Sequence, residues 1–457
     1  TISKIIQPAH GTVVRSMEVG PVGLIYTPYQ DYNTEVEGQK DEFTYTADDG
    51  HGGKSSATVR VSVSAVNDKP EIFAHPKYVI DEDNELVFSS SLGRRIAVND
   101  RDLEETENGT LIVNLSAVGS VILNPDGNVT ITDGADSTSS ITFTGDLEAI
   151  NAAIDGLRYS PVEDASGEGA GSLTITVNDQ GYTGGDPESA QHNIQIDIRQ
   201  VNDRPVLSDI ESDTLSYKED GGPVQVSATL KVGDAEGNIA GAIVKIKNHA
   251  PGDLLGYNNG QDAADISVSF NSTTGILTLT GDATSSQYQR VLRSITYVST
   301  SQNPVGGARF IVYRVGDGIA KSNEVSRQID VTAINDKPEI VALDSVTAVE
   351  DTQLLFSSSN NNEINIVDLD RDVVDVTISV NSGSIDINRV TGVEVITEFE
   401  DGGFYRIKFQ GLVKNVNTAL SGLIYTPLEN VSGSSADVLQ LVVADKGNTG
   451  SGGVLMD

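Results

Sequence analysis

The sequence predicts an all-β protein made of tandem β-sandwich modules, and three observations support this prediction. Short runs of Thr, Val, Ile and Ser alternate between polar and apolar positions, as in strands with one buried face. Gly is frequent, at 45 residues, and aromatic residues make up only 5% of the chain, which favours many tight turns over long helices. One short phrase recurs at almost constant intervals along the 457 residues, which indicates repeated domains.

The recurring phrase marks the predicted boundaries between modules. It occurs as Val66-Asn67-Asp68-Lys69-Pro70, Val201-Asn202-Asp203-Arg204-Pro205 and Ile334-Asn335-Asp336-Lys337-Pro338, with intervals of 135 and 133 residues. Each phrase follows an alternating strand, and its Pro has no N–H group with which to continue sheet pairing. We therefore expect the C-terminal part of a module in residues 1–66, modules in 67–201 and 202–334, and a module truncated at its C-terminal end in 335–457.

Each longer module is also predicted to contain one short helix. Leu147, Ile150, Ile154 and Leu157 have helical spacing, and Asp146 can cap the helix at its N-terminus. In the last module Val413, Val416, Leu420 and Leu423 repeat the spacing.

Three acidic motifs recur in the same order within the modules. The first is an acidic pair soon after the linker: Glu82-Asp83, Glu219-Asp220 and Glu350-Asp351. The second is an alternating motif: Asp100-Arg101-Asp102, Asp234-Ala235-Glu236 and Asp368-Leu369-Asp370. The third is a late Asp beside a Gly, after a strand: Asp179, Asp317 and Asp445. Four motifs in a fixed order make chance similarity a poor explanation.

Composition excludes several classes of function. The chain carries 66 acidic and 30 basic residues, a net charge of −36 that repels nucleic acid and anionic membrane surfaces and favours cationic partners. No Cys is present, so disulfides and thiolate metal sites are excluded. The sequence contains no apolar run of membrane-spanning length and begins without a leader pattern, so we expect an internal piece of a longer protein.

Catalytic motifs are also absent from the sequence. The five His residues show no metal-ligand or triad spacing, and neither a G-x-S-x-G elbow nor a phosphate-binding loop occurs. We therefore expect a protein that is not an enzyme.

The motif set resembles the cadherin-like tandem repeats of large bacterial, RTX-type surface adhesins and, more distantly, the cadherins. The resemblance implies Greek-key sandwiches in a linear array, with Ca²⁺ held between successive modules by the upstream acidic pair, the Asn-Asp linker, the alternating motif and the late Asp. The first junction would use Asn67, Asp68, Asp100, Asp102 and Asp179, its acidic pair falling before Thr1. The second would use Glu82, Asp83, Asn202, Asp203, Asp234, Glu236 and Asp317. The third would use Glu219, Asp220, Asn335, Asp336, Asp368, Asp370 and Asp445.

The sequence departs from the cadherin pattern in three respects. The modules are longer than a usual cadherin repeat, the second alternating motif is Asp-Ala-Glu, and the Asp-Arg-Glu motif of the upstream module has no evident counterpart.

Physical chemistry gives an independent reason to expect Ca²⁺. This ion takes 6–8 oxygen ligands, and Asp, Glu and Asn side chains supply them. Alternating residues on an extended segment point to the same side, so both acids of one motif can face one ion. Clustered carboxylates without a cation repel one another, by roughly 1 kcal/mol or more for each close pair. The alternative is that the linker is only a turn and the acids only a solvated surface.

These inferences predict a Ca²⁺-rigidified extender of an extracellular adhesin or cell-surface protein, which projects a ligand-binding tip. Its partners would be the neighbouring modules, with possible self-association and no direct membrane insertion. One alternative is a structural subunit of an extracellular filament or surface layer. Another is a glycan- or protein-binding module, which would place a concave site in one module alone, and the absence of Trp gives that reading little support.

Overall fold

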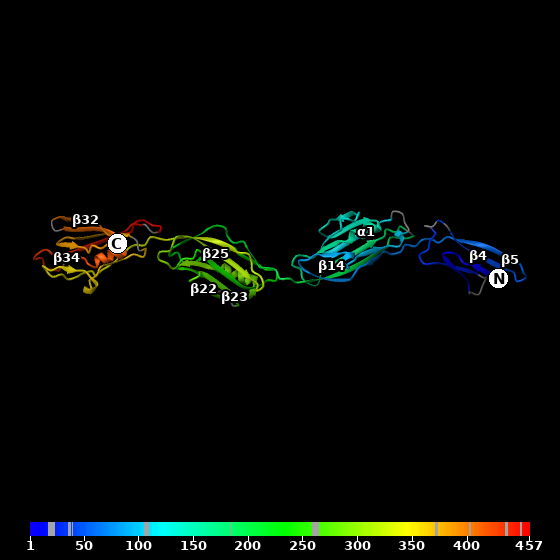
Figure 1. The fold of residues 1–457 in the computed structure, drawn as a ribbon, viewed down its shortest axis with the longest axis horizontal. Helices are drawn as coiled ribbons and strands as arrows, with labels where there is room; N and C mark the ends of the chain where they lie inside the picture. The colour runs from blue at the N-terminus through cyan, green and yellow to red at the C-terminus, as the bar shows by residue number, and fades with distance from the viewer. Residues whose placement is uncertain are drawn as a thin grey trace. The chain divides into compact units, whose positions relative to one another are not determined.

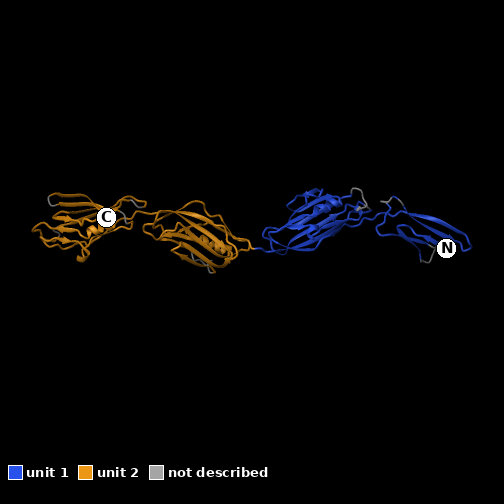
Figure 2. Cartoon of the chain, viewed as in Figure 1, with its two compact units in different colours: residues 1–201 blue, residues 202–457 orange. Residues whose placement is uncertain are grey.

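The computed structural model describes residues 1–16, 23–34, 38, 40–104, 109–182, 184–257, 265–370, 373–401, 404–434, 437–447 and 450–457. The chain divides into two compact units, Thr1–Val201 and Asn202–Asp457 (Figure 2). Strands predominate in both units, and the sheets fall into four successive groups that share no strand (Figure 1). The predicted all-β fold of tandem sandwiches is confirmed, whereas the residue boundaries of the modules stay predictions.

The first sandwich contains two small antiparallel sheets. Its strands are β1 (Ile2–Ile6), β2 (Gly11–Arg15), β3 (Leu24–Pro28), β4 (Asp41–Asp48) and β5 (Lys54–Val61). One sheet has the order β1-β4-β5 and the other pairs β2 with β3. Gly11 faces the ring of Tyr26 so closely that a Cβ atom would lie 2.8 Å from it, which requires glycine at this position.

The second sandwich completes the first unit. Its elements are β6 (Glu71–Phe73), β7 (Lys77–Asp81), β8 (Leu86–Phe88), β9 (Ala97–Asn99), β10 (Leu111–Ile122), β11 (Thr130–Gly134), β12 (Thr138–Gly145), α1 (Leu147–Ile154), β13 (Leu157–Ser160), β14 (Gly167–Asn178) and β15 (Ser189–Arg199). Its large sheet has the order β11-β12-β10-β14-β15-β7, and β13 connects the end of β10 to β8. All these pairs are antiparallel except β15 with β7, which is parallel.

The third sandwich repeats this plan in the second unit. Its elements are β16 (Val206–Ser208), β17 (Leu215–Lys218), β18 (Val224–Gln225), β19 (Lys231–Gly233), β20 (Asn238–Lys247), β21 (Asp253–Gly256), β22 (Ser267–Asn271), β23 (Ile276–Thr284), α2 (Ser285–Arg293), β24 (Thr296–Ser299), β25 (Gly307–Gly316) and β26 (Val325–Thr332). The large sheet has the order β17-β26-β25-β20-β23-β22 and faces a second sheet, β18-β24-β21. The pair of β17 with β26 is again parallel.

The fourth sandwich follows in the same unit. Its elements are β27 (Glu339–Val341), β28 (Leu354–Leu355), β29 (Asn365–Val367), β30 (Val373–Val380), β31 (Ser384–Asp386), β32 (Val393–Asp401), β33 (Phe404–Leu412), α3 (Val413–Leu420), β34 (Ile424–Thr426) and β35 (Leu439–Asp445). One sheet has the order β32-β33-β30-β35 and the other has the order β28-β34-β31.

The second, third and fourth sandwiches each enclose a separate apolar core, and the predicted short helix contributes to each. In α1, Ile150, Ala153 and Ile154 are buried, and the Asp146 side chain caps the helix by accepting from the Ala149 N–H. Helices α2 and α3 bury the equivalent face. The helices of the described residues are short, and none combines the length and apolar character that a membrane crossing requires.

Candidate metal centre at the linkers

All three linkers have the same local structure, built around the Asn of the repeated phrase. Its amide nitrogen donates to one oxygen of the late Asp, which lies at or just after the end of a strand of the following sandwich. The pairs are Asn67 to Asp179 (2.9 Å), Asn202 to Asp317 (3.0 Å) and Asn335 to Asp445 (2.9 Å). The Asn side chain therefore attaches each linker to the sandwich that it precedes.

The linker Asp makes a second repeated contact. Its backbone N–H donates to the last acid of the alternating motif, which the chain places beside the linker. The pairs are Asp68 to Asp102 (2.6 Å), Asp203 to Glu236 (3.1 Å) and Asp336 to Asp370 (2.7 Å). Linker, alternating motif and late Asp thus meet at the N-terminal end of each sandwich.

Backbone donors fix the orientation of the late Asp. In the second sandwich, one oxygen of Asp179 accepts from the N–H groups of Gly181 (3.0 Å) and Glu188 (2.8 Å). Asp317 and Asp445 are held in the same way by N–H groups of the loops that follow them. Because one oxygen is fixed by the backbone and the other by the linker Asn, the carboxylate has a single orientation.

The first linker contains buried oxygen atoms that lack hydrogen-bond partners. Oδ1 of Asn67 and Oδ2 of Asp100 are buried, and neither has a donor within the described residues. Burial raises the pKa of Asp100 to about 6, and the carboxylates of Asp102 and Asp179 act in the same direction. An unpartnered buried oxygen is costly, and a cation among these atoms would remove the cost.

Asp31 is a further acid at the first linker that the sequence motifs did not identify. It lies on the loop after β3, and its carboxylate is 2.5 Å from the guanidinium of Arg101, the middle residue of the alternating motif. Burial is the main cause of a raised pKa at Asp68; Asp102 and Asp31 add to it, and Arg101 opposes it. Arg101 therefore brings a fixed positive charge to the acids of this linker.

The third linker combines residues from the third and fourth sandwiches, both in the second unit. The backbone N–H of Ile334 donates to Oε2 of Glu219 (2.8 Å), so the upstream acidic pair reaches the linker. Oε1 of Glu219, Oδ1 of Asn335 and Oδ2 of Asp336 are buried and lack donors within the described residues. All predicted ligands of this junction except Asp220 and Asp336 are at most 6% exposed.

Electrostatics at the third linker is purely repulsive among its acids. Burial raises the pKa of Glu219, and the carboxylates of Asp336, Asp220 and Asp370 add to the effect. Burial likewise raises the pKa of Asp336, with a contribution from Asp220. Among the described residues, no basic side chain contributes to either shift, and the alternating motif has Leu369 at the position of Arg101.

Two polar contacts near the third linker involve residues that the motifs did not predict, and the second of them joins the third and fourth sandwiches. The amide of Gln302 donates to Asp220 (3.1 Å), and the amide of Asn303 donates to the backbone carbonyl of Asp370 (2.9 Å). These residues follow β24 just as Asp31 follows β3. In both sandwiches the loop comes a few residues after the strand with the repeated Tyr. That position in the sequence is the signal that could have identified these residues.

The ligands predicted for the second junction are divided between the two compact units. In the first unit the Val201 N–H donates to Oε1 of Glu82 (2.5 Å), as Ile334 does to Glu219, and Asp83 is exposed. In the second unit Asn202, Asp203, Asp317 and Glu236 form the contacts given above, and Asp234 accepts from the Asn238 N–H (3.2 Å).

Carboxylate and amide oxygens are the donors that Ca²⁺ prefers, and no thiol is available in this chain. The buried oxygens without donors at the first and third linkers fit such an ion. His side chains are absent from all three linkers. The donor set is therefore that of a hard cation rather than of zinc.

Comparisons with known proteins agree with the immunoglobulin-like fold expected for the modules. Residues 1–62 match a family model described as a bacterial Ig domain. No curated protein matches the chain.

Several solved cadherin structures align with nearly the whole chain at low similarity. Protocadherin gammaB7 EC3-6 has 14% identity and a TM-score of 0.33, covering 100% of this chain and 95% of that chain. Mouse cadherin-23 EC22-24 has 14% identity and a TM-score of 0.26, covering 85% and 97%. Drosophila N-cadherin EC1-4 has 14% identity and a TM-score of 0.21, covering 100% and 90%. The strand order within each sandwich, described above, establishes the β-sandwich fold.

Proposed function

We propose that this chain is an extender segment of an extracellular adhesion protein, in which Ca²⁺ bound at the linkers restricts movement between successive sandwiches. The observation that carries the proposal is the repeated linker structure. An Asn and an Asp bind the late Asp and the alternating motif in the same way three times, with distances that differ by at most 0.5 Å for each contact.

The buried oxygens explain why a cation would stiffen the chain. At the third linker, Glu219 comes from the third sandwich, Asp336 from the linker and Asp370 from the fourth sandwich. Without a cation their carboxylates repel one another, and Oε1 of Glu219 and Oδ2 of Asp336 are buried without donors within the described residues. A bound Ca²⁺ would turn that repulsion into shared coordination, so that bending the linker would break metal–oxygen bonds.

The spacer role also accounts for the surface chemistry. A net charge of −36 keeps such a chain soluble and repels anionic surfaces, and its strands offer no disulfide to stiffen it. The proposal includes an extracellular location, where millimolar Ca²⁺ suits sites of modest affinity. It assigns no catalytic role, and the bacterial RTX-type adhesins remain the proposed family.

Small-angle X-ray scattering of the whole chain tests the proposal. Profiles recorded in millimolar Ca²⁺ should show a long, stiff particle, and chelation should make it more flexible. A matched sample in Mg²⁺ at the same ionic strength controls for screening of the acidic surface, because Mg²⁺ keeps its waters and its strict octahedral geometry. Identical profiles in Ca²⁺, Mg²⁺ and chelator would refute the linker sites and leave the acids as a solvated surface.

Assembly into a filament or surface layer is the alternative function. It requires contacts between copies of the chain, which the spacer role does not. Electron micrographs of concentrated protein in Ca²⁺ separate the two, because assembly predicts regular filaments or lattices and the spacer role does not.

A further inference from the structure

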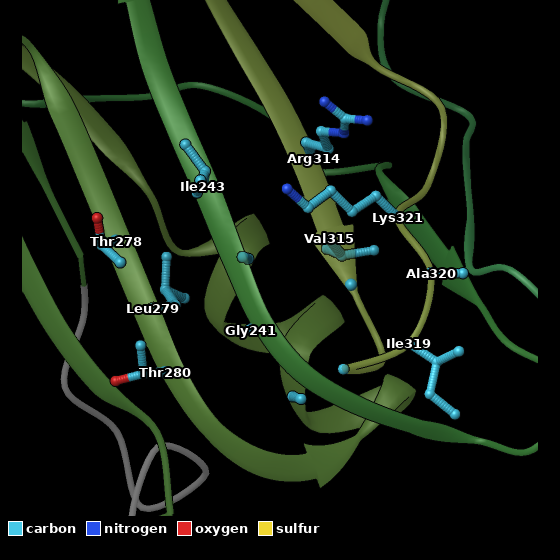
Figure 3. Close-up of a pocket in the computed structure, with 14 residues that line it drawn as sticks. Gly241, Ile243, Thr278, Leu279, Thr280, Arg314, Val315, Ile319, Ala320 and Lys321 are labelled. Atoms are coloured by element: carbon cyan, nitrogen blue, oxygen red, sulfur yellow. The ribbon is translucent and has the colours of Figure 1, made fainter.

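A hollow of about 380 Å³ lies on the outer face of the third sandwich, over β20, β23 and β25 (Figure 3). We call it the basic hollow; Gly241, Ile243, Thr278, Arg314, Ile319 and Lys321 line it. Gly241 stands opposite Thr280 on β23 and Gly316 on β25. Because Gly241 and Gly316 have no side chains, the hollow forms beside Thr280 and the segment that carries Lys321.

The border of the hollow combines apolar and basic groups. Ile243 is 47% exposed and Ile319 is 82% exposed. Arg314 pairs with Ile243 across the strands, and Lys321 pairs with Gly316, so both basic side chains belong to this face (Figure 3). Arg314 lies 3.8 Å from Glu324, and Lys321 has no ion pair within the described residues.

Further bases lie on the same face of β20. Lys245 and Lys247 are exposed and alternate with the buried Val244 and Ile246. In a chain with a net charge of −36, a face with four bases is exceptional, and it favours an anionic partner.

The same face of the second sandwich has different chemistry. There Asn114 stands opposite Thr176, and Ser116 opposite Thr174, so β10 and β14 present neutral polar side chains. Asn114 also donates to Thr142 on β12 (2.8 Å), which completes a polar network across the strands. The second sandwich therefore has neutral polar side chains at positions where the third has the basic hollow.

We propose that the basic hollow binds a second copy of this chain, which inserts the edge strand β32 of its fourth sandwich. The basic hollow and β32 are complementary in charge, and both expose apolar side chains. Strand β32 is at the edge of its sheet, and its Ile396 and Phe399 are 42% and 52% exposed. Glu400 and Asp401 follow Phe399 and have no ion pair within the described residues. Exposed edge strands of this kind are common sites of association.

In the proposed contact Phe399 occupies the apolar floor of the hollow, and Glu400 and Asp401 approach Arg314 and Lys321. One strand on one small face buries less surface than a stable dimer needs, so the dissociation constant should be on the order of tens of micromolar. Because exposed charges contribute much of the attraction, added salt should weaken the association. Because the N–H groups of Ile319 and Ala320, at the border of the hollow, also donate to Asp317, the test keeps the Ca²⁺ concentration constant.

Sedimentation equilibrium of the whole chain over a range of concentrations, in constant Ca²⁺, tests this proposal. Wild type should associate reversibly, and less so in high salt. The double variant Arg314→Glu with Lys321→Glu, and separately Phe399→Ser, should weaken association at least about tenfold. Mixing the basic-to-acidic variant with Glu400→Lys and Asp401→Lys should restore association between the two proteins.

The control is Lys4→Glu with Lys414→Glu, which changes net charge equally at exposed sites outside both surfaces. It should associate as wild type does. The proposal is refuted if wild type stays monomeric, or if the control loses association equally. It is also refuted if Phe399→Ser associates normally, because the hollow would then accept something other than β32.

Discussion

The first and third linkers share one half of their structure and differ in the other. Both attach the linker Asn to a late Asp and the linker Asp to the alternating motif. Around this shared half, the first linker adds Asp31 paired with Arg101, whereas the third adds Glu219 and Asp220 and has the uncharged Leu369 at the position of Arg101. The contacts made by the repeated motifs are constant, whereas the residues supplied by the preceding sandwich and the middle residue of the alternating motif set the charge of each linker.

The largest expected effect is that of Asp370→Asn at the third linker. Losing this carboxylate should weaken Ca²⁺ binding there by about a hundredfold, roughly 2.7 kcal/mol, and leave the first linker unchanged. Calorimetric titration with Ca²⁺ should show one weakened class of sites. Asp344→Asn, an exposed acid at the start of the same sandwich, is the matched control. Equal losses in both variants would mean that general charge, not coordination, determines binding.

Glu211 lies away from the linkers, so the stability of a Glu211 variant gives a reference that does not depend on Ca²⁺. Burial alone would raise the pKa of Glu211, but hydrogen bonds from Ser227 and the Ala228 N–H, with nearby Arg327, lower it to about 2. Since the folded-state pKa is below the unfolded value, this stabilisation is present above about pH 4.5 and is lost as pH falls toward 2.

Glu211→Gln should therefore destabilise the third sandwich by roughly 2 kcal/mol at neutral pH. The difference from wild type should shrink as the pH is lowered through that range. Denaturant unfolding at several pH values, with and without Ca²⁺, measures this difference in stability between the variant and wild type. A difference that depends on Ca²⁺ but not on pH would show that Glu211 acts through the linkers.

Exchanging the middle residues of two alternating motifs sharpens the comparison of the linkers. Arg101→Leu removes the positive charge from the first linker, and Leu369→Arg adds one to the third. At about 1 kcal/mol for one charge near a bound ion, Ca²⁺ affinity should rise roughly fivefold in the first variant and fall similarly in the second. Titration calorimetry detects both changes. Shifts in the same direction would contradict the role given to Arg101.

The smallest effect is expected from Asn303→Ala. This change removes the hydrogen bond to the Asp370 carbonyl, worth about 1 kcal/mol, while the metal ligands stay in place. Scattering in Ca²⁺ should stay close to wild type, but the chelated protein should become more flexible. No change in the chelated state would mean that this contact does not restrict the third linker.

The sequence predicted the shared half of the linkers because it is local and repeated. Asn67 and Asp179 are far apart in the chain, yet the fixed order of the motifs and the resemblance to cadherin-like repeats place them in one group. The α1 cap at Asp146 was equally predictable, since capping depends on neighbouring residues. The role of Asp31 was not predictable from the sequence, because only the fold of the loop after β3 brings this residue close to Arg101.

The basic hollow could not be predicted for a similar reason. Gly241 and Gly316 are ordinary strand residues in the sequence, and they meet only through the register of β20 and β25. Register depends on the packing of a whole sheet, which a single sequence pattern does not specify.

The parallel pairs at the sheet edges affect how an extender would resist mechanical load. In the second sandwich β7, near the entry of the chain, lies parallel to β15, which leads directly into the next linker. The pair of β17 with β26 repeats this arrangement. Tension along the chain pulls the two strands of each pair in opposite directions along their length. Their hydrogen bonds are then strained together in shear instead of opening one after another, so each sandwich would yield only at high force.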